Sequence, residues 1–371
     1  MKLMLKCRDI VFICDPLLSE YGPLRPALLI ANKFREKGKR ITMVSTTISA
    51  KMQEKLTSMG IDTVNLQKEP FLKKNESIAW MEEWIREAMF FMNSRGFTKL
   101  DGIVLNFSNT ICLPSHAWYA QGPPTVTLDN MKRSLSLPYK LGYLFLAPFF
   151  KASDKTFTTR MANCSKLVVA NSKYLSSVYQ SKFGVQVNSV IYPPLDCSQF
   201  KPKTAKPSED FALTYFGKEA VFDLVKQSLD LGIKIKAFGG KLSMAPKKIR
   251  EHANLEFLGR IDDDTLIDLY SNALFTFYPF TDEPFGYIPL ESLACGTPVL
   301  TFNKQGPKET IANNETGWLV DGELELSKRA LRIWREGYPK IFRGNCRQRA
   351  LEFDTNKIVK AWKDLLNAIH T

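Results

Sequence analysis

The chain has 371 residues, of which 44% are hydrophobic and 24% charged, and 51 Lys and Arg residues against 38 Asp and Glu residues give it a formal net charge of +13. This composition is that of a globular protein and excludes a disordered, collagen-like or coiled-coil chain. At roughly 150 residues per domain, the length predicts two domains, or three. The positive excess predicts a negatively charged partner, such as nucleic acid, an anionic membrane surface or a phosphate-bearing substrate.

The cysteines and the apolar runs indicate in which compartment, and with what kind of membrane attachment, the protein is expected. Seven cysteines are scattered without a Cys-x-x-Cys pair, which favours neither a disulfide framework nor a zinc site. The longest apolar run, residues 141–150, is shorter than the roughly 20 residues that a membrane span needs. Lys6, Arg8 and Asp9 interrupt the apolar start, so we interpret it as a strand rather than a signal peptide. We expect a cytoplasmic protein, either soluble or attached peripherally to the cytoplasmic face of the membrane.

In the first half of the chain, apolar strands alternate with amphipathic helices. The predicted strands are residues 9–14, 41–45, 61–66, 102–105, 124–128, 167–170 and 188–192. The predicted helices are residues 26–37, 50–59, 76–94 and 172–182. This order is typical of a doubly wound parallel sheet.

The alternation stops once and then restarts. Residues 201–210 read KPKTAKPSED, without an apolar period, and predict a linker. Beyond it we predict strands at 211–216, 233–238, 255–258, 274–278 and 298–302, with helices at 219–231, 264–271 and 287–294. The sequence therefore predicts two Rossmann-like domains, residues 1–205 and 206–352, followed by a last helix within 353–371. The carboxyl edges of their sheets would face a central cleft, where ligands bind in such folds.

The two halves differ in charge. Residues 1–205 contain 28 Lys and Arg against 15 Asp and Glu, whereas residues 206–371 contain 23 of each. The whole positive excess therefore belongs to the N-terminal domain.

The most informative stretch is residues 280–311, FTDEPFGYIPLESLACGTPVLTFNKQGPKETI. Glu283 lies in a loop after a predicted strand, Gly286 opens the next helix, and Glu291 falls about one turn inside it. The first turn of a helix has free N–H groups that bind phosphate. Two carboxylates beside it would hold the hydroxyls of a sugar and a ribose. The alternative is that Glu283 caps the helix and Glu291 is an exposed helical residue.

The string E-x-F-G-x-x-x-x-E-S-x-A-x-G-T-P-V, residues 283–299, resembles the donor-site signature of the retaining glycosyltransferases of family 4, which have the GT-B fold. Residues 167–184, 190–202, 255–273 and 313–320 resemble further stretches of that family, in the same order. The resemblance implies that the last helix crosses back to the N-terminal domain.

The resemblance also implies roles in binding a nucleotide-diphosphate sugar. Glu291 should hold the ribose hydroxyls and Glu283 the transferred sugar. The backbone N–H groups of Phe285 and Gly286 should face the distal phosphate, and Tyr287 belongs to the same donor-binding set.

The cationic contacts to the diphosphate match the family pattern only in part. Gly217 and Lys218 correspond to its Gly-Arg pair, but Leu224 stands where the family has a second cation, a lysine. Lys241 or Arg260 would replace it, since both follow predicted strands. The resemblance implies that Lys218 stabilises the departing phosphate.

Each of three further features of the sequence has two possible interpretations. Gly22, in the family's glycine-rich loop, would let the backbone approach phosphate or acceptor, or is an ordinary turn glycine. His116, after the fourth predicted strand, is a candidate catalytic residue or a structural histidine. The run Asp262-Asp263-Asp264 resembles a metal-binding D-x-D motif, but an N-cap followed by an acidic first turn explains it. We therefore expect no metal and no cofactor.

We expect retaining transfer of a hexose, mannose as the first choice, from GDP-mannose or a UDP-sugar to a glycan or a lipid-linked sugar. Residues 131–166 combine basic residues with apolar ones at helical spacing and would lie on an anionic membrane, or else form a core helix with a solvated basic face. Two alternatives remain: a soluble glycosyltransferase making a small glycoside or glucan, and a catalytically silent binding subunit. A nucleic-acid partner is not expected, because the sequence contains no recognised binding module.

Overall fold

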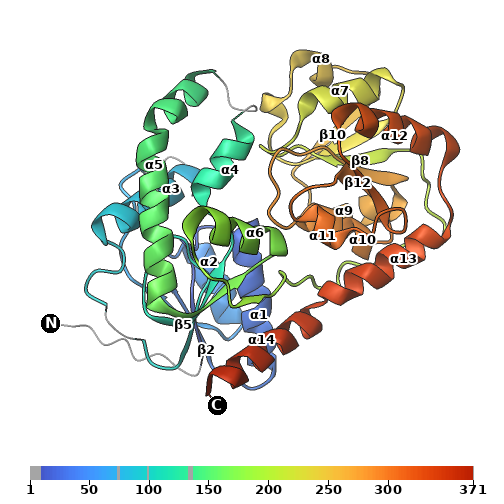
Figure 1. The fold of residues 1–371 in the computed structure, drawn as a ribbon. Coiled ribbons are helices and arrows are strands. Elements are labelled where there is room, and N and C mark those ends of the chain that lie inside the picture. The colour runs from blue at the N-terminus through green and yellow to red at the C-terminus, as the bar shows by residue number, and fades with distance from the viewer. Residues whose placement is uncertain (1–9, 73–75, 98–99, 133–136, 371) are drawn as a thin grey trace. The chain divides into compact units, whose positions relative to one another are not determined.

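The computed structural model describes residues 10–72, 76–97, 100–132 and 137–370 (Figure 1). The chain divides into two compact units, with residues 1–127, 138–194 and 355–371 in unit 1, and residues 128–137 and 195–354 in unit 2. The boundary falls at 194/195, before the predicted linker. Residues 201–210 contain no helix or strand and belong to unit 2.

Unit 1 is built on a parallel sheet with the strand order β3-β2-β1-β4-β5-β6-β7. Its strands are β1 (Ile10–Ile13), β2 (Ile41–Ser45), β3 (Asp62–Asn65), β4 (Ile103–Asn106), β5 (Ser115–Ala120), β6 (Ser165–Ala170) and β7 (Ser189–Val190). The strand order reverses between β1 and β4, and this switch point is where ligands bind in many doubly wound sheets.

Helices cover both faces of this sheet. They are α1 (Arg25–Glu36), α2 (Ala50–Ser58), α3 (Glu76–Phe90), α5 (Leu137–Cys164), α6 (Lys173–Val178) and α14 (Thr355–His370). The successive residues Trp118 and Tyr119 of β5 lie in different core clusters, because neighbouring strand residues point to opposite faces. One cluster contains residues of α1, α2 and α14, and the other contains residues of α3, α5 and α6.

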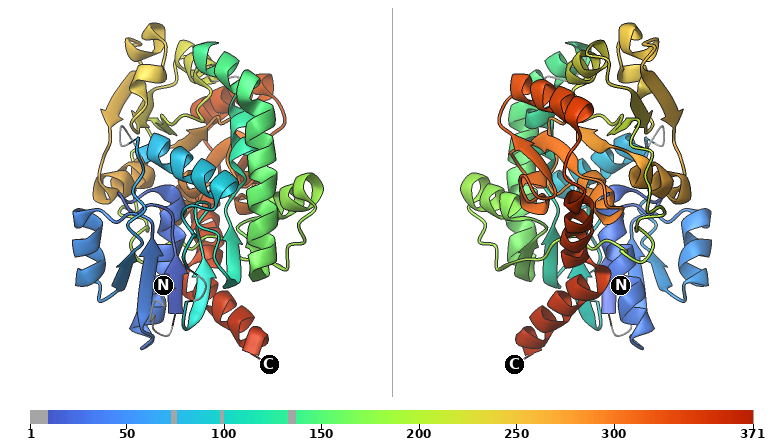
Figure 2. Two further views of the ribbon diagram at one scale, coloured as in Figure 1. Left: turned by 90° about the vertical axis from the view of Figure 1, so that its left-hand side faces the viewer. Right: turned by 90° about the vertical axis from the view of Figure 1, so that its right-hand side faces the viewer.

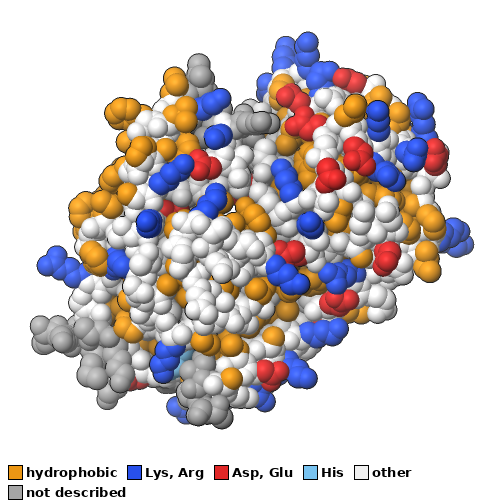
Figure 3. All heavy atoms as spheres, in the orientation of Figure 1, with side chains coloured by type: hydrophobic (Ala, Val, Ile, Leu, Met, Phe, Trp, Pro, Cys, Tyr) orange, Lys and Arg blue, Asp and Glu red, His pale blue; other side chains and the backbone are white. Residues whose placement is uncertain are grey.

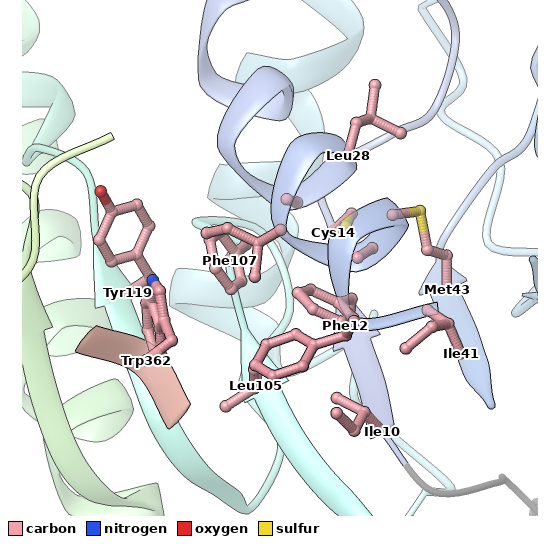
Figure 4. Packing of buried hydrophobic residues seen from close by; sticks show 14 of the residues in the cluster. Ile10, Phe12, Cys14, Leu28, Ile41, Met43, Leu105, Phe107, Tyr119 and Trp362 are labelled. Atoms are coloured by element: carbon pink, nitrogen blue, oxygen red, sulfur yellow. The ribbon is translucent and has the colours of Figure 1, made fainter. Parts of the chain in front are cut away.

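The C-terminal helix α14 is part of unit 1 and lies against α1 (Figure 2). Its Trp362 is fully buried, and the indole ring lies 5.5 Å from the rings of both Phe107 and Tyr119 (Figure 4). A buried aromatic cluster of this kind contributes more to stability than its area alone predicts. The last helix therefore helps to form the core beneath β4 and β5.

The predicted strand at 124–128 is wrong. Residues Pro124–Met131 form helix α4, and the strand between β4 and β6 is Ser115–Ala120. Pro123 and Pro124 have no amide N–H for a ladder in a central strand, but proline is favoured in the first turn of a helix. Of residues 131–166, those at 133–136 lie outside the described residues, and Leu137–Cys164 form the helix α5 that the apolar spacing predicts.

Unit 2 is built on a second parallel sheet, with the order β10-β9-β8-β11-β12-β13. Its strands are β8 (Ala212–Tyr215), β9 (Ile235–Phe238), β10 (Leu255–Gly259), β11 (Phe275–Tyr278), β12 (Val299–Phe302) and β13 (Gly317–Val320). Its longer helices are α7 (Phe222–Asp230), α9 (Asp263–Asn272), α10 (Tyr287–Ala294), α12 (Glu323–Glu336) and α13 (Ile341–Ala350). Here the strand order reverses between β8 and β11. Two parallel sheets with connecting helices confirm the predicted α/β class.

Candidate active site

The candidate site lies at the carboxyl edge of the unit 2 sheet. The loops that follow β8 and β11 flank the switch point and are joined by backbone hydrogen bonds. Val221 N donates to Pro279 O at 3.0 Å, and Thr281 N donates to Glu219 O at 2.8 Å. Since all the strands are parallel, the loops after β9, β10 and β12 reach the same edge. This edge therefore collects the side chains that follow five strands.

Hydrogen bonds to its side chain and to its backbone hold Glu283 in place at the switch point. Its carboxylate accepts a bond from Tyr278 Oη at 2.6 Å. Its backbone N–H donates to Gln305 Oε1 at 2.7 Å, and its carbonyl accepts from Gly306 N at 3.0 Å. Tyr278 is the last residue of β11, whereas Gln305 and Gly306 follow β12, so two adjacent strands fix one half-buried side chain.

The surroundings of Glu283 favour its protonated form. Its pKa is raised to about 7, with burial as the largest cause and the nearby carboxylates of Glu219 and Asp282 acting in the same direction. Hydrogen bonds from the Tyr278 phenol and the Phe285 backbone N–H act in the opposite direction. Glu283 is therefore poised to change charge near neutral pH, which is common for groups in active sites.

The turn from Glu283 into α10 requires glycine. Gly286 has a φ of +103°, and a Cβ there would lie 3.3 Å from both Pro289 and Pro307. Helix α10 then begins at Tyr287, as predicted, and the Tyr287 ring packs edge-on against the buried Phe285 ring. The Phe285 N–H, assigned to a phosphate from the sequence, donates to the Glu283 carboxylate in this structure.

Glu291 is buried, with only 4% of its surface exposed, which excludes the alternative of a solvated helical glutamate. Tyr270 Oη donates to its carboxylate at 3.3 Å. A buried carboxylate is costly unless it is well hydrogen-bonded, so a glutamate here points to a role beyond helix formation. Both glutamates of the motif therefore accept a hydrogen bond from a tyrosine phenol.

Three cationic side chains extend from the same edge. Lys218, Lys241 and Arg260 are all exposed and follow β8, β9 and β10. The Arg260 guanidinium lies over Gly240, where a Cβ would be 3.0 Å from Nε. Leu224, at the position of the second family cation, is fully buried in α7, so that position supplies no charge. Lys241 and Arg260 therefore both remain candidates for the second cationic contact to the diphosphate.

Gly22 and His116 belong to unit 1. His116 lies within β5 rather than in a loop, and its Nδ1 accepts a hydrogen bond from Val104 N at 3.1 Å. It is the second residue of a parallel strand and so lies near the amino edge of the sheet, opposite the loops that follow the strands. Gly22 opens a short 3₁₀ turn, and a Cβ there would contact nothing within 4 Å. Neither position shows a geometric requirement for a role in catalysis.

The aspartate run is a helix cap, as predicted. The Asp262 side chain accepts a hydrogen bond from Thr265 N at 2.8 Å, and Asp263 and Asp264 form the acidic first turn of α9. Within the part of the chain that the structure describes, no group of three or more His, Cys, Asp or Glu side chains is placed to hold a metal ion.

Sequence reasoning missed the tyrosines. Tyr278 and Tyr270 hold the two glutamates, and the half-buried Tyr215 ends β8 beside them. A signal was present, because Tyr215 and Tyr278 each end an apolar strand immediately before a loop of the site. Asp282 and Gln305 were also missed, since only the fold brings 282 and 305 together, at 3.5 Å.

The part of the chain that contains this site is similar in sequence to known proteins. Residues 220–350, which include both glutamates, match the family described as glycosyl transferases group 1. The chain is 25% identical over 189 residues to D-inositol 3-phosphate glycosyltransferase of Rhodococcus jostii (strain RHA1), covering 43% of this chain and 42% of that protein. It is 27% identical over 204 residues to alpha-1,3/1,6-mannosyltransferase of Mus musculus, covering 44% and 48%. The matches span less than half the length of these relatives.

The similarity in fold is wider than the similarity in sequence. The structure of Anabaena HepE in complex with UDP is similar with a TM-score of 0.67 and 15% identity, covering 97% of this chain and all of that one. At this identity the likeness concerns the fold, and it agrees with the two Rossmann-like units described above. The sequence matches support a relationship between this chain and the glycosyl transferases group 1 family.

Proposed function

We propose that this protein is a retaining glycosyltransferase of family 4 that transfers a hexose from a nucleotide-diphosphate sugar to a hydroxyl group. One observation carries the proposal: Glu283 and Glu291, each hydrogen-bonded by a tyrosine, flank the start of α10 at the switch point of unit 2. In the proposed complex Glu291 binds the ribose and Glu283 binds the transferred sugar.

The chemistry follows from the charges at this edge. Lys218 and the first turn of α10 would stabilise the diphosphate as it leaves, which is the kind of preorganised electrostatic contact that contributes most to many enzymes. The departing phosphate would help to deprotonate the acceptor hydroxyl, which attacks from the same face of the sugar and retains its configuration. No metal enters the proposal, because cations and helix N–H groups neutralise the same charge.

Mannose from GDP-mannose is the first choice of donor, supported by the similarity to a mannosyltransferase. A UDP-sugar is the second, supported by the similarity in fold to a protein solved in complex with UDP. A thermal-shift panel of GDP, UDP, ADP and their sugars tests the proposal, since a nucleotide that binds the folded state raises the melting temperature. Glu291→Ala should weaken the shift, and Glu256→Ala, an exposed glutamate of β10, should not. A wild-type protein stabilised by none of these nucleotides would overturn the proposal.

A lipid-linked sugar is the acceptor that the surface of unit 1 favours. Helix α5 exposes five large apolar side chains, the most exposed being Phe145 at 85%. The five are Leu141, Leu144, Phe145, Leu146 and Phe149. Exposed lysines lie on the same helix at 140, 151 and 155, and Figure 3 shows hydrophobic and basic side chains together over this part of unit 1. A soluble monomer rarely exposes such a patch without a function.

The patch extends onto α3, which packs against α5. Ser153 Oγ contacts Met89 Sδ at 3.0 Å, and the Arg160 guanidinium lies 3.3 Å from the centre of the Phe91 ring. Phe90 and Phe91 are themselves largely exposed. No helix among the described residues has the length and apolar character needed to cross a bilayer. The proposal is therefore peripheral attachment to the cytoplasmic face of an anionic membrane, by apolar contact and charge attraction together.

Flotation with liposomes tests the membrane contact separately from catalysis. Wild-type protein should float with vesicles containing anionic lipid, and less with neutral vesicles or at high salt. The double variant Leu144→Ser, Phe145→Ser should lose flotation without a change in melting temperature. The matched control is Leu324→Ser, Ile341→Ser, which removes two equally exposed apolar side chains from unit 2. Wild-type protein that never floats would instead favour a soluble acceptor.

A further inference from the structure

Tyr215 lies at the switch point of unit 2, beside the candidate site, and has no role in the function proposed above. It is the last residue of β8, and its ring is enclosed by the two loops that follow β8 and β9. A Cβ on Gly217 would lie 2.3 Å from Tyr215 Cε1, and a Cβ on Gly239 would lie 2.9 Å from Cε2. Side chains essentially never approach that closely, so both glycines make room for this ring.

The enclosed ring has a fixed orientation. Its plane is tilted against the Phe238 ring, with 5.3 Å between the two centroids. Tyr215 is half-buried, and among the described residues none forms a hydrogen bond with its phenol oxygen. A rigid, partly exposed hydroxyl that bonds to none of the described residues is suited to donate a hydrogen bond to a bound molecule.

The charged groups around the Tyr215 phenol indicate which part of a nucleotide-sugar donor its hydroxyl would contact. Glu219, Glu283 and Glu291 all act electrostatically on Tyr215, and so does the Arg260 guanidinium. Burial and the three carboxylates raise the pKa of the Tyr215 phenol, so it keeps its proton. In the proposed complex Glu291 binds the ribose and Glu283 binds the sugar, and the group between these two is the diphosphate.

We propose that the Tyr215 hydroxyl donates a hydrogen bond to the diphosphate of the nucleotide and so positions the leaving group. This inference rests on the proposed function. It also accounts for the buried Leu224, because a neutral donor on β8 supplies part of the contact that a second cation would give. Tyr215 would then set the preference for a diphosphate over a monophosphate.

Titration calorimetry with Tyr215→Phe tests the proposal. Phenylalanine keeps the ring between Gly217 and Gly239 and removes only the hydroxyl. Whichever of GDP and UDP binds the wild-type protein should bind the variant about 10- to 100-fold more weakly, the loss expected for one hydrogen bond to a charged group. The corresponding monophosphate and nucleoside should lose less than about 3-fold. The control is Tyr338→Phe, which removes a half-buried phenol of unit 2 that accepts a bond from Arg343.

The outcomes of this experiment distinguish a failure of this inference from a failure of the proposed function on which it rests. A selective loss of diphosphate affinity in Tyr215→Phe, with nucleoside affinity and melting temperature unchanged, supports a contact to the diphosphate. Equal diphosphate affinity of variant and wild type would overturn the inference and leave the proposed function intact. Equal losses for diphosphate, monophosphate and nucleoside would also overturn it, since they indicate a general disturbance. A wild-type protein that binds no nucleotide would overturn the function first.

Discussion

The two units share a topology but use its switch point differently. In unit 1, Asp15 follows β1, and the loop 108–110 follows β4 on the other side of the switch. The Asp15 carboxylate accepts hydrogen bonds from Ser108 Oγ at 2.6 Å, Asn109 N at 2.8 Å, Thr110 Oγ1 at 2.9 Å and Trp80 Nε1 at 2.9 Å. Asp15 is 5% exposed, so this edge is closed by its own side chains.

In unit 2 the equivalent edge is open. Glu283 accepts bonds from one phenol and one backbone N–H, Lys218 is exposed, and the Tyr215 phenol forms no hydrogen bond with the described residues. Both switch points carry a carboxylate whose pKa is raised by burial. The same topology therefore carries a carboxylate enclosed by its own hydrogen-bond donors in unit 1, and exposed polar groups in unit 2.

The largest effect is expected at the open edge. Glu283→Gln keeps the shape of the side chain and removes its charge, so the transfer rate should fall by about 10²- to 10³-fold. The measurement is a steady-state assay with the donor found by thermal shift. The control Glu256→Gln changes an exposed glutamate of β10 and should leave the rate unchanged. An unchanged rate in Glu283→Gln would show that Glu283 takes no part in transfer, whereas wild-type protein that binds the donor but transfers no sugar would indicate a binding subunit.

At the closed edge the expected effect is on stability. Asp15→Ala leaves the donors of Ser108, Thr110 and Trp80 without their partner, which should lower the free energy of unfolding by about 2–4 kcal/mol. Urea unfolding measures it. Asp15→Asn retains a carbonyl oxygen and should recover part of the loss. If Asp15→Ala kept full stability but lost nucleotide binding, the contrast between the two edges would be broken.

The pH dependence of activity sharpens the comparison further. Tyr278→Phe removes a donor that favours ionised Glu283, so the pKa of that carboxyl should rise from about 7 by roughly half a unit to one unit. The acid limb of the kcat/KM profile should move to higher pH by the same amount. Tyr270→Phe, which alters the partner of Glu291, should leave that limb in place. Identical profiles for all three proteins would exclude Glu283 as the titrating group.

The last prediction concerns Glu83, which is buried in unit 1 and accepts a bond from Thr46 Oγ1 at 2.5 Å. Its pKa is raised to about 8, with burial as the largest cause and the Asp15 carboxylate acting in the same direction. The folded state therefore holds an extra proton between the unfolded pKa near 4.5 and about 8, so this contribution to stability is lost as pH rises through that window. Glu83→Gln should flatten stability against pH. An unaltered slope would show that Glu83 does not titrate there.

Local sequence patterns predicted much of the fold. Most of the strands, the start of α10 at Tyr287 and the cap at Asp262 depend on residues close in sequence, so spacing alone predicts them. Spacing did not predict β13, α12 and α13. At residues 115–131 a short buried strand and a helix that starts with proline were confused. A short apolar run does not show whether it pairs with a neighbouring strand, and only the contacts of β5 with β4 and β6 decide this.

The sequence by itself determined the two Rossmann-like units, the donor-site string and the placement of the charge. Only the tertiary structure decided how each carboxylate is surrounded. Asp15 and Ser108 are 93 positions apart, and Tyr270 and Glu291 are 21 apart, so no local pattern reports these bonds. Hydrogen bonds and burial between distant residues set the charge state and availability of a group. For that reason one switch point became core, and the other became the candidate active site.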